Sequence, residues 1–332
     1  MSYPDFAIII PYYQREPGLL RRAVTSALEA AGGRAAQVIV VDDGSPHRAE
    51  KDLVGLKTPS TAWVKIIHQE NAGPAAARNT GLNNVAEGAR WVTFLDSDDY
   101  WIGPFLEDAE NALSRGFDFF FGNSRRFSQR RARFEWGKNP EENINPSDHP
   151  QVDPVQELYE FRGDFFGLLV RRTNIISANT MAYRFDRYSA ARFPTELFQG
   201  EDRLFKLKMA RDLKHIAFSP KIYAEEGEGV NIFDKSNWGS PKSLALAYNY
   251  VKLSKMILQQ LDLTAEQRSY LAQKLTESRE SFLSVLLHLV RIRAPIDWRV
   301  VGRMIRDDPR AIPLAPLNLA RVMRRRREAA AR

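Results

Sequence analysis

The 332-residue chain contains no cysteine, and this absence removes several kinds of chemistry at once. A thiol nucleophile, a zinc site with cysteine ligands, an iron–sulfur cluster and a disulfide framework are all excluded. The five histidines show no metal-ligand spacing, so we interpret each of them as structural; they are His47, His68, His149, His215 and His288. Cysteine chemistry plays no part in this protein.

Long apolar runs are also missing. No segment reaches the ~18 apolar residues that a membrane span requires. The opening residues MSYPDFAIIIPYY lack a basic region ahead of their short apolar run, which predicts a strand and not a signal peptide. We therefore expect a cytoplasmic location. Apolar residues make up 44% and charged residues 27%, which is typical of a soluble globular protein, and the length suggests one large or two smaller domains.

The net charge of +7 is not spread evenly along the chain. Residues 291–332 hold 12 arginines and four acidic residues, a balance of +8, so the first 290 residues sum to −1. A uniformly basic nucleic-acid-binding domain would look different. The charge therefore belongs to a C-terminal tail. Residues 296–327 of this tail mix apolar side chains with arginine, which suits a helix lying on an anionic membrane surface. A helix packed on the body, or a contact between subunits, remains the alternative.

Strand and helix patterns alternate through the first 120 residues, which predicts an α/β fold with a mostly parallel sheet flanked by helices. Strands are expected at 7–13, 37–45, 63–69, 90–99 and 117–123, and helices at 17–31 and 73–88. A hairpin is expected at 125–136, then helices at 155–170 and 200–213 with a strand at 175–184 between them. The chain reads as helical from residue 241. Leu271, Leu275, Phe282, Val285, Leu286 and Leu289 trace one apolar face there.

Polar residues follow three of these strands, where ligands bind in parallel sheets. Asp42-Asp43-Gly44-Ser45 could accept hydrogen bonds from a nucleobase or ribose, or form a turn that caps the next helix. Asp96-Ser97-Asp98-Asp99 offers three carboxylates that suit Mg²⁺ or Mn²⁺, whereas a helix cap explains only one of them. Asn71–Asn79 leads into a helix of small residues. There Arg78 could clamp a phosphate or a carboxylate, or form a structural ion pair.

The order of IIIPYYQRE, VDDGS, ENAGPAAARNTGL and FLDSDDYW resembles the family 2 glycosyltransferases, which have the GT-A fold. The resemblance implies an inverting enzyme that moves a sugar from a nucleoside diphosphate donor, usually UDP, with Mg²⁺ or Mn²⁺. Asp96 and Asp98 match the family's D-x-D, with Asp98 the direct metal ligand. The positions that it implies for the nucleotide sugar are Pro11, Tyr12, Tyr13, Glu16, Asp43, Asn71, Gly73, Arg78, Asp96 and Ser97. Tyr12 and Gln14 depart from the common Thr or Ser and Asn.

A further match lies at Gly200–Phe205, GEDRLF, which resembles the family's acceptor-side E-D motif, with ISANTMAYR upstream. Inversion requires a base that takes a proton from the acceptor hydroxyl as it attacks. Asp202 is the expected base and Glu201 its neighbour, while Asn179 and Arg203 are expected to contact the acceptor. A pair of capping carboxylates on an ordinary helix is the alternative.

Two weaker signals remain. The loop at Glu226–Phe233 lies where the family closes over the donor, and Glu228 or Asn231 could touch metal or pyrophosphate. A group of arginines could receive an anionic acceptor or lie on a solvated hairpin; it consists of Arg125, Arg126, Arg130, Arg131 and Arg133.

We therefore expect a glycosyltransferase domain at 1–235, with a nucleotide-sugar half at 1–123 and an acceptor half at 124–235. A helical region with the basic tail follows at 236–332. The expected partners are a UDP-sugar donor, a saccharide or lipid-linked acceptor and an anionic membrane surface on the cytoplasmic side. No nucleic acid is expected. Two other interpretations are weaker. A sugar nucleotidyltransferase tends to have a Gly-rich basic loop after its first strand, which YYQREPG lacks, and a nucleic-acid-binding module would rest on the tail alone.

Overall fold

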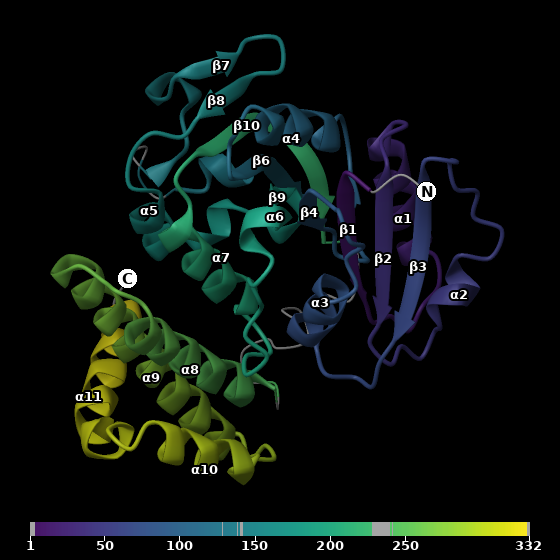
Figure 1. Cartoon of the computed structure of the whole chain (residues 1–332). Helices are drawn as coiled ribbons and strands as arrows, with labels where there is room; N and C mark the ends of the chain where they lie inside the picture. Colours follow the sequence, from purple (N-terminus) through teal and green to yellow (C-terminus); the bar gives the residue numbers. More distant parts are fainter. Residues whose placement is uncertain are drawn as a thin grey trace. The chain divides into compact units, whose positions relative to one another are not determined.

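The computed structural model describes residues 4–127, 129–137, 139, 142–227, 240 and 242–330, without the side chains of Thr173 and residues 322–330. The chain divides into two compact units (Figure 1). The first comprises Met1–Glu196 and Glu201–Val230, and the second comprises Leu197–Gly200 and Asn231–Arg332. The predicted domain boundary after residue 235 and the predicted donor contacts Glu228 and Asn231 lie outside the described residues.

The first unit is built on one mixed sheet with the strand order β3-β2-β1-β4-β9-β6-β10-β8-β7, and β5 pairs with β10. The strands are β1 (Phe6–Tyr12), β2 (Ala36–Asp42), β3 (Ala62–His68), β4 (Trp91–Phe94), β5 (Tyr100–Trp101), β6 (Phe119–Arg126), β7 (Gln151–Asp153), β8 (Leu158–Glu160), β9 (Met181–Arg184) and β10 (Ile216–Glu226). The helices are α1 (Leu19–Ala31), α2 (Ala49–Asp52), α3 (Pro74–Leu82), α4 (Phe105–Ser114), α5 (Phe165–Arg172), α6 (Phe185–Tyr188) and α7 (Glu201–Asp212).

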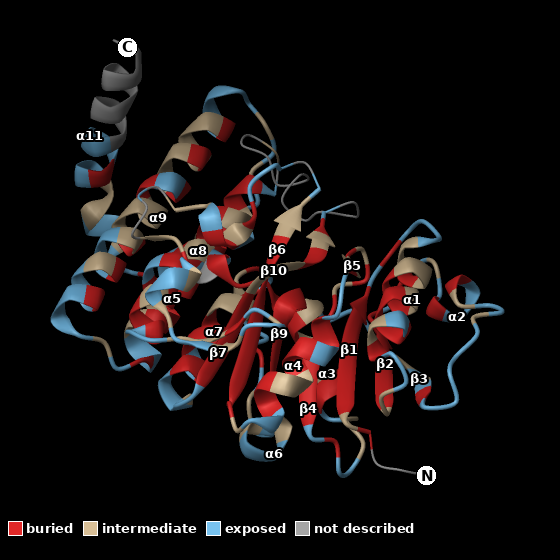
Figure 2. Ribbon diagram, turned by 90° about the horizontal axis from the view of Figure 1, so that it is seen from above, coloured by how far each residue is buried: buried red, intermediate tan, exposed pale blue. Residues whose placement is uncertain are grey.

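The strands β3, β2, β1 and β4 are parallel and form the half of the sheet that the sequence predicts best. Every residue of β1 is buried, as the red ribbon in Figure 2 shows. Ile8 and Ile10 point into the core that includes α1 and α4, while Ile9 faces α3 on the other side. Helices therefore cover both faces, which explains why β1 is a continuous apolar run and not an alternating one. The predicted α/β class is confirmed.

The small residues of α3 allow this helix to lie close to the sheet. Ala75, Ala77 and Gly81 are buried, and a Cβ atom at Gly81 would lie 2.4 Å from Cγ2 of Ile9. No real Cβ atom tolerates that separation, so glycine is required here by packing. The small side chains of the Asn71–Asn79 segment thus serve helix–sheet packing.

Strand β9 runs antiparallel to both of its neighbours, β4 and β6. This arrangement brings the residues just before β9 beside the residues just after β4. It is the reason why Asn179, in a 3₁₀ turn at Ala178–Thr180, lies against the acidic segment that begins at Asp96. A sheet with only parallel strands would have placed these two segments at opposite edges.

Two predictions in the middle of the chain are wrong. The hairpin expected at 125–136 is absent from the described residues there, because β6 continues to Arg126 and a 3₁₀ turn at Arg133–Glu135 buries Phe134. The helix expected at 155–170 begins only at Phe165, and β7 and β8 occupy 151–160 as the actual hairpin. The sequence prediction fails here because β8 pairs with β10 towards one edge of the sheet, and this long-range pairing outweighs local helical preference.

The second unit is helical, as predicted. Its helices are α8 (Ser243–Gln260), α9 (Ala265–Arg291), α10 (Trp298–Asp307) and α11 (Ala311–Ala330). Leu275, Phe282, Val285 and Leu289 of α9 are buried in a core that also holds Val300 and Met304 of α10. The predicted apolar face of α9 is thereby confirmed. Within the described part of the chain, no helix combines the length and the apolar character needed to span a bilayer.

Candidate active site

The carboxyl ends of β1, β2 and β4 bring three of the predicted segments to one edge of the sheet. Asp43, after β2, accepts hydrogen bonds from the backbone N–H groups of Ala72 and Gly73, both at 2.8 Å, and from Nε2 of Gln69 at 2.7 Å. Nδ2 of Asn71 donates to the carbonyl oxygen of Asp43 at 2.8 Å. Asp43, Asn71 and Gly73, which the sequence predicts as nucleotide contacts, are therefore joined to one another.

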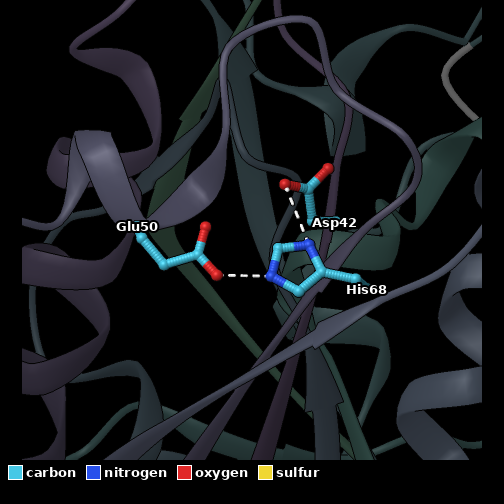
Figure 3. Close-up of side chains that lie close together, drawn as sticks. All are labelled: Asp42, Glu50 and His68. Atoms are coloured by element: carbon cyan, nitrogen blue, oxygen red, sulfur yellow. Dashed lines mark hydrogen bonds and ion pairs between the residues drawn. The ribbon is translucent and has the colours of Figure 1, made fainter.

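Asp42 has a different role from its neighbour. Its carboxylate accepts hydrogen bonds from the N–H of Ser45 at 2.7 Å and of Ala49 at 3.1 Å, which forms the turn and cap that the sequence left open as an alternative. Figure 3 shows this carboxylate beside His68, whose other ring nitrogen contacts Glu50. Within the described residues this is the one group of three potential metal ligands close enough to share an ion. Since both oxygens of Asp42 already have backbone donors, we interpret it as a structural cluster.

The segment after β4 gathers carboxylates into a small volume. Asp96, Asp98 and Asp99 lie near Glu226, the last residue of β10, and the N–H of Gly227 donates to Asp99 at 2.8 Å. Burial and the neighbouring Asp96 raise the pKa of Asp98 to about 6, and burial with Asp98, Asp96 and Glu226 raises the pKa of Asp99 as well. Burial and the repulsion between these carboxylates therefore both disfavour their ionised forms.

Buried contacts hold the acidic segment in place. Oδ1 of Asn179 accepts a hydrogen bond from the N–H of Asp96 at 2.8 Å, and its Nδ2 donates to Asp99. Nε2 of Gln14 lies 3.5 Å from Oγ of Ser97. Arg133 forms an ion pair with Glu226, so that burial, which raises the pKa of Glu226, is outweighed and the pKa falls below its usual value. Asn179, predicted as an acceptor contact, thus orients the acidic segment.

Arg78 connects the acidic segment to the start of α7. Its guanidinium donates to Asp96 at 2.6 Å and to Glu201 at 2.8 Å, and its side chain is only 6% exposed. Of the two roles that the sequence left open, the structure contains the ion pair. The guanidinium is held by both carboxylates, so loss of Arg78 would leave two neighbouring carboxylates without their common cation.

The first turn of α7 presents two carboxylates with opposite environments. Burial raises the pKa of Glu201 to about 7 against the lowering effect of Arg78. Burial would also raise the pKa of Asp202, but Lys206, at 2.9 Å, and Arg78 outweigh it and lower this pKa to about 2. The side chain of Asp202 is 34% exposed and that of Glu201 only 9%. Asp202 is therefore the carboxylate of the pair that is both ionised and accessible.

The model of the family described as glycosyl transferase family 2 matches residues 7–184, which is more than half of the chain. This chain belongs to glycosyl transferase family 2. The family resemblance inferred from its motifs is confirmed, and the protein is a glycosyltransferase. The matched residues run from β1 to the end of β9 and so include the acidic segment, Arg78 and Asn179.

Two relatives show how far the likeness extends. The succinoglycan biosynthesis protein ExoW of Rhizobium meliloti (strain 1021) is 29% identical over 322 residues, 92% of this chain and 94% of ExoW. The minor teichoic acid biosynthesis protein GgaA of Bacillus subtilis (strain 168) is 38% identical over 117 residues, 35% of this chain and 24% of GgaA. The likeness to ExoW thus extends over nearly the whole chain, whereas that to GgaA covers about a third of this glycosyltransferase.

Two solved structures share the fold. S. aureus TarS 1-349 in complex with UDP-GlcNAc has a TM-score of 0.53 and 22% identity, covering 84% of this chain and 73% of that one. The mannosyltransferase PcManGT from Pyrobaculum calidifontis, in complex with GDP-Man and Mn²⁺, has a TM-score of 0.53 and 15% identity, covering 96% and 84%. At these identities the likeness shows the fold alone.

The other predicted donor and acceptor residues of this glycosyltransferase differ in their exposure and in their contacts. Pro11 and Tyr12 are buried in β1, and Oη of Tyr12 donates to the carbonyl of His47 at 2.7 Å, so its ring belongs to the core. Tyr13 and Glu16 are exposed. Nη2 of Arg203 donates to the carbonyl of Val170 at 3.2 Å, which ties it to α5.

Sequence reasoning missed two residues of this site. Lys206 lies one turn after Asp202, so the i,i+4 spacing of opposite charges could have revealed it. Glu226 was predicted only as the start of a loop over the donor. Nothing in its local sequence links it to Asp99, because β10 reaches the acidic segment through the sheet and not along the chain.

Proposed function

We propose that this glycosyltransferase inverts the anomeric centre of a UDP-sugar and transfers the sugar to a saccharide or lipid-linked saccharide. The observation that carries the proposal is the link between the two halves of the site. Arg78 binds Asp96 of the acidic segment and Glu201 of α7, within one compact unit. A donor held at the acidic segment and an acceptor at α7 would thus lie at one site.

A divalent cation, Mg²⁺ or Mn²⁺, fits the acidic segment. The donor set consists of carboxylate oxygens, which hard cations prefer. Asp98 would hold the ion together with the oxygen of Asp96 that does not bind Arg78. The charge of Arg22 lowers the pKa of Asp98 but does not offset burial and Asp96, so the added positive charge of a cation is favoured there. When bound, such an ion supplies the positive charge that stabilises the departing diphosphate.

Asp202 is the proposed general base. The acceptor hydroxyl loses its proton to the Asp202 carboxylate as its oxygen forms the new bond to the anomeric carbon, and the bond from that carbon to the diphosphate breaks with its electron pair leaving on the diphosphate. The N-terminal turn of α7 and Lys206 both favour the ionised carboxylate. Glu201 is mostly buried and bound to Arg78, so we assign it the positioning of Arg78 and not proton transfer.

A nucleoside diphosphate sugar as the donor is supported by two solved structures of the same fold, which differ in the nucleobase. TarS binds UDP-GlcNAc in its crystal structure, and PcManGT binds GDP-Man with Mn²⁺. The similarity to ExoW over nearly the whole chain supports a role in polysaccharide assembly, where a lipid-linked acceptor would be extended. The cytoplasmic face of a membrane remains the predicted place of this reaction.

A thermal-shift screen of nucleotide sugars, with and without Mn²⁺, tests the proposal. We expect UDP-sugars to raise the melting temperature most, and only when the metal is present. A bound ligand at about 100 times its Kd adds about 2.7 kcal/mol to the free energy of unfolding, so binding is visible as a shift of the melting temperature. Stabilisation by GDP-sugars alone would show that uracil is the wrong nucleobase. Equal stabilisation without metal would argue against the ion at Asp98.

A Lys206→Met variant is expected to shift the pH profile of transfer. The substitution removes the cation that lowers the pKa of Asp202 but leaves the burial that raises it, so this pKa rises. Because a base loses activity as pH falls through its pKa, the acid limb of kcat/KM moves to higher pH. The matched control is Lys208→Met, which removes one exposed positive charge from the same helix. Identical acid limbs in both variants would contradict the assignment of Asp202.

A further inference from the structure

The exposed apolar side chains of this protein concentrate near its C-terminus. Seven of the thirteen large apolar side chains that are exposed in the described part of the chain lie between Val290 and Leu319. Five of them belong to α10 and α11 and are 37–67% exposed: Trp298, Ile305, Ile312, Leu317 and Leu319, which we call the C-terminal apolar face. An apolar patch on a folded protein marks an interaction surface, and these side chains stand on two consecutive helices.

Each helix turns one side to its own unit and an apolar side outward. In α10, Val300 and Met304 are buried in the helical core, while Trp298 and Ile305, seven residues apart, share the opposite side. In α11, Asn318 is buried, while Ile312, Pro316 and Leu317 are exposed. Figure 2 shows the corresponding pale blue segments on α11. The outward apolar side is therefore a property of the folded helices and not of an unfolded tail.

The corner between these helices is rigidly held. Asp308 is 1% exposed and accepts hydrogen bonds from Arg279 of α9, at 2.6 and 2.8 Å, and from Lys255 of α8, at 3.2 Å. Arg321 lies 3.7 Å from Glu280 of α9. The helices of the tail thus pack against α8 and α9, as one of the two alternatives expected, but only one side of each helix takes part in this packing.

Arginines border the apolar face. The ten residues 311–320 contain no charge at all. Exposed Arg299, Arg303, Arg306 and Arg310 precede them, and Arg321 and the run at 324–327 follow. Three acids lie nearby: Asp308 binds Arg279 inside the unit, Asp307 binds Tyr248 and the exposed Arg306, and Asp297 caps α10. They are fewer than the arginines. The border of the face is therefore positive.

We propose that the C-terminal apolar face docks this protein on an anionic phospholipid surface, with apolar side chains among the acyl chains and arginines at the headgroups. An apolar centre with a basic border is what such a surface complements, and tryptophan is favoured at the interface. A second copy of the chain fits less well, because a two-fold interface would bring the arginines of both copies together. A nucleic acid offers no partner for the apolar centre.

Sedimentation of the full-length protein with vesicles tests this inference without any measurement of transfer. Vesicles of phosphatidylcholine alone are compared with vesicles that also contain phosphatidylglycerol. We expect binding to the anionic vesicles only, and weaker binding as salt is raised. An Ile312→Glu/Leu317→Glu variant should bind at least about tenfold more weakly, since two apolar contacts are lost and two negative charges are added.

The matched control is Val54→Glu/Val155→Glu, which adds the same charge at two exposed apolar positions of the first unit. We expect it to bind vesicles as the natural chain does. Equal binding by the Ile312→Glu/Leu317→Glu variant, or equal binding to neutral and anionic vesicles, overturns the proposal. A dimer that this variant dissociates, without vesicle binding by the natural chain, assigns the face to a second copy instead. If the variant fails to fold, the lipid and salt comparison of the natural chain still decides.

Discussion

The Asp202→Asn variant is expected to bind donor normally and to transfer sugar about 10²–10⁴-fold more slowly. The amide has nearly the size of the carboxylate but accepts no proton, so the loss belongs to the transition state and should appear in kcat more than in the donor KM. The carboxylate is accessible in the first turn of α7, and its ionised form is stabilised by Lys206 at 2.9 Å. Initial rates over a range of donor concentrations, together with donor affinity by calorimetry, measure the split.

Two further variants separate catalysis from structure. Asp212→Asn changes an exposed carboxylate at the other end of α7 and should leave transfer unchanged. Glu201→Gln should be milder than Asp202→Asn if Glu201 only positions Arg78. Near-normal transfer by Asp202→Asn with an inactive Glu201→Gln would move the base to Glu201. If both variants unfold, the capping interpretation of this carboxylate pair gains support, and Lys206→Met then provides the independent test.

The Asp98→Ala variant is expected to lose all metal-dependent binding of UDP. Asp98 is a carboxylate at the segment where four acidic side chains gather. Its removal takes away the ligand that would join the cation to the diphosphate. Titration calorimetry of UDP, with and without Mn²⁺, measures the difference between the two affinities.

Removal of Asp98 should not unfold the protein, because it relieves repulsion between neighbouring carboxylates. The control Asp148→Ala removes one exposed carboxylate far along the chain and should retain the full metal dependence. A metal-dependent affinity for UDP that survives in Asp98→Ala would show that the ion lies elsewhere. In that case the cluster of Asp42, Glu50 and His68 would be the next candidate to change.

The parts of the fold that the sequence predicted well are those set by local pattern. The continuous apolar run of β1 indicates a strand covered on both faces, and the periodic leucines of α9 indicate one buried side. The order of the four N-terminal motifs was sufficient to indicate the family. The site residues on these motifs could be named because carboxylates at strand ends have a chemistry of their own.

The parts of the fold that the sequence predicted poorly depend on how strands pair at the edge of the sheet. The segment at 151–160 has no strong strand pattern, yet β8 pairs with β10 and β7 with β8. Conversely, the arginine-rich segment after β6 turns inward at Phe134 instead of returning as a hairpin. Pairing with a strand formed more than 50 residues later is a tertiary effect, to which local propensity gives no access.

The sequence by itself determined the elements and their chemistry: buried strands, acids at their ends, and the E-D pair at the start of α7. Only the tertiary structure decided which charges face one another. Arg78 binds Asp96, 18 residues away, and Glu201, 123 residues away, and the same sheet brings Glu226 to Asp99. Spacing along the chain determines contacts within a helix or strand. Contacts between distant segments follow from the strand order of the sheet. A charge that is buried there is stable only beside a partner of opposite charge, and the sheet decides which residue that partner is.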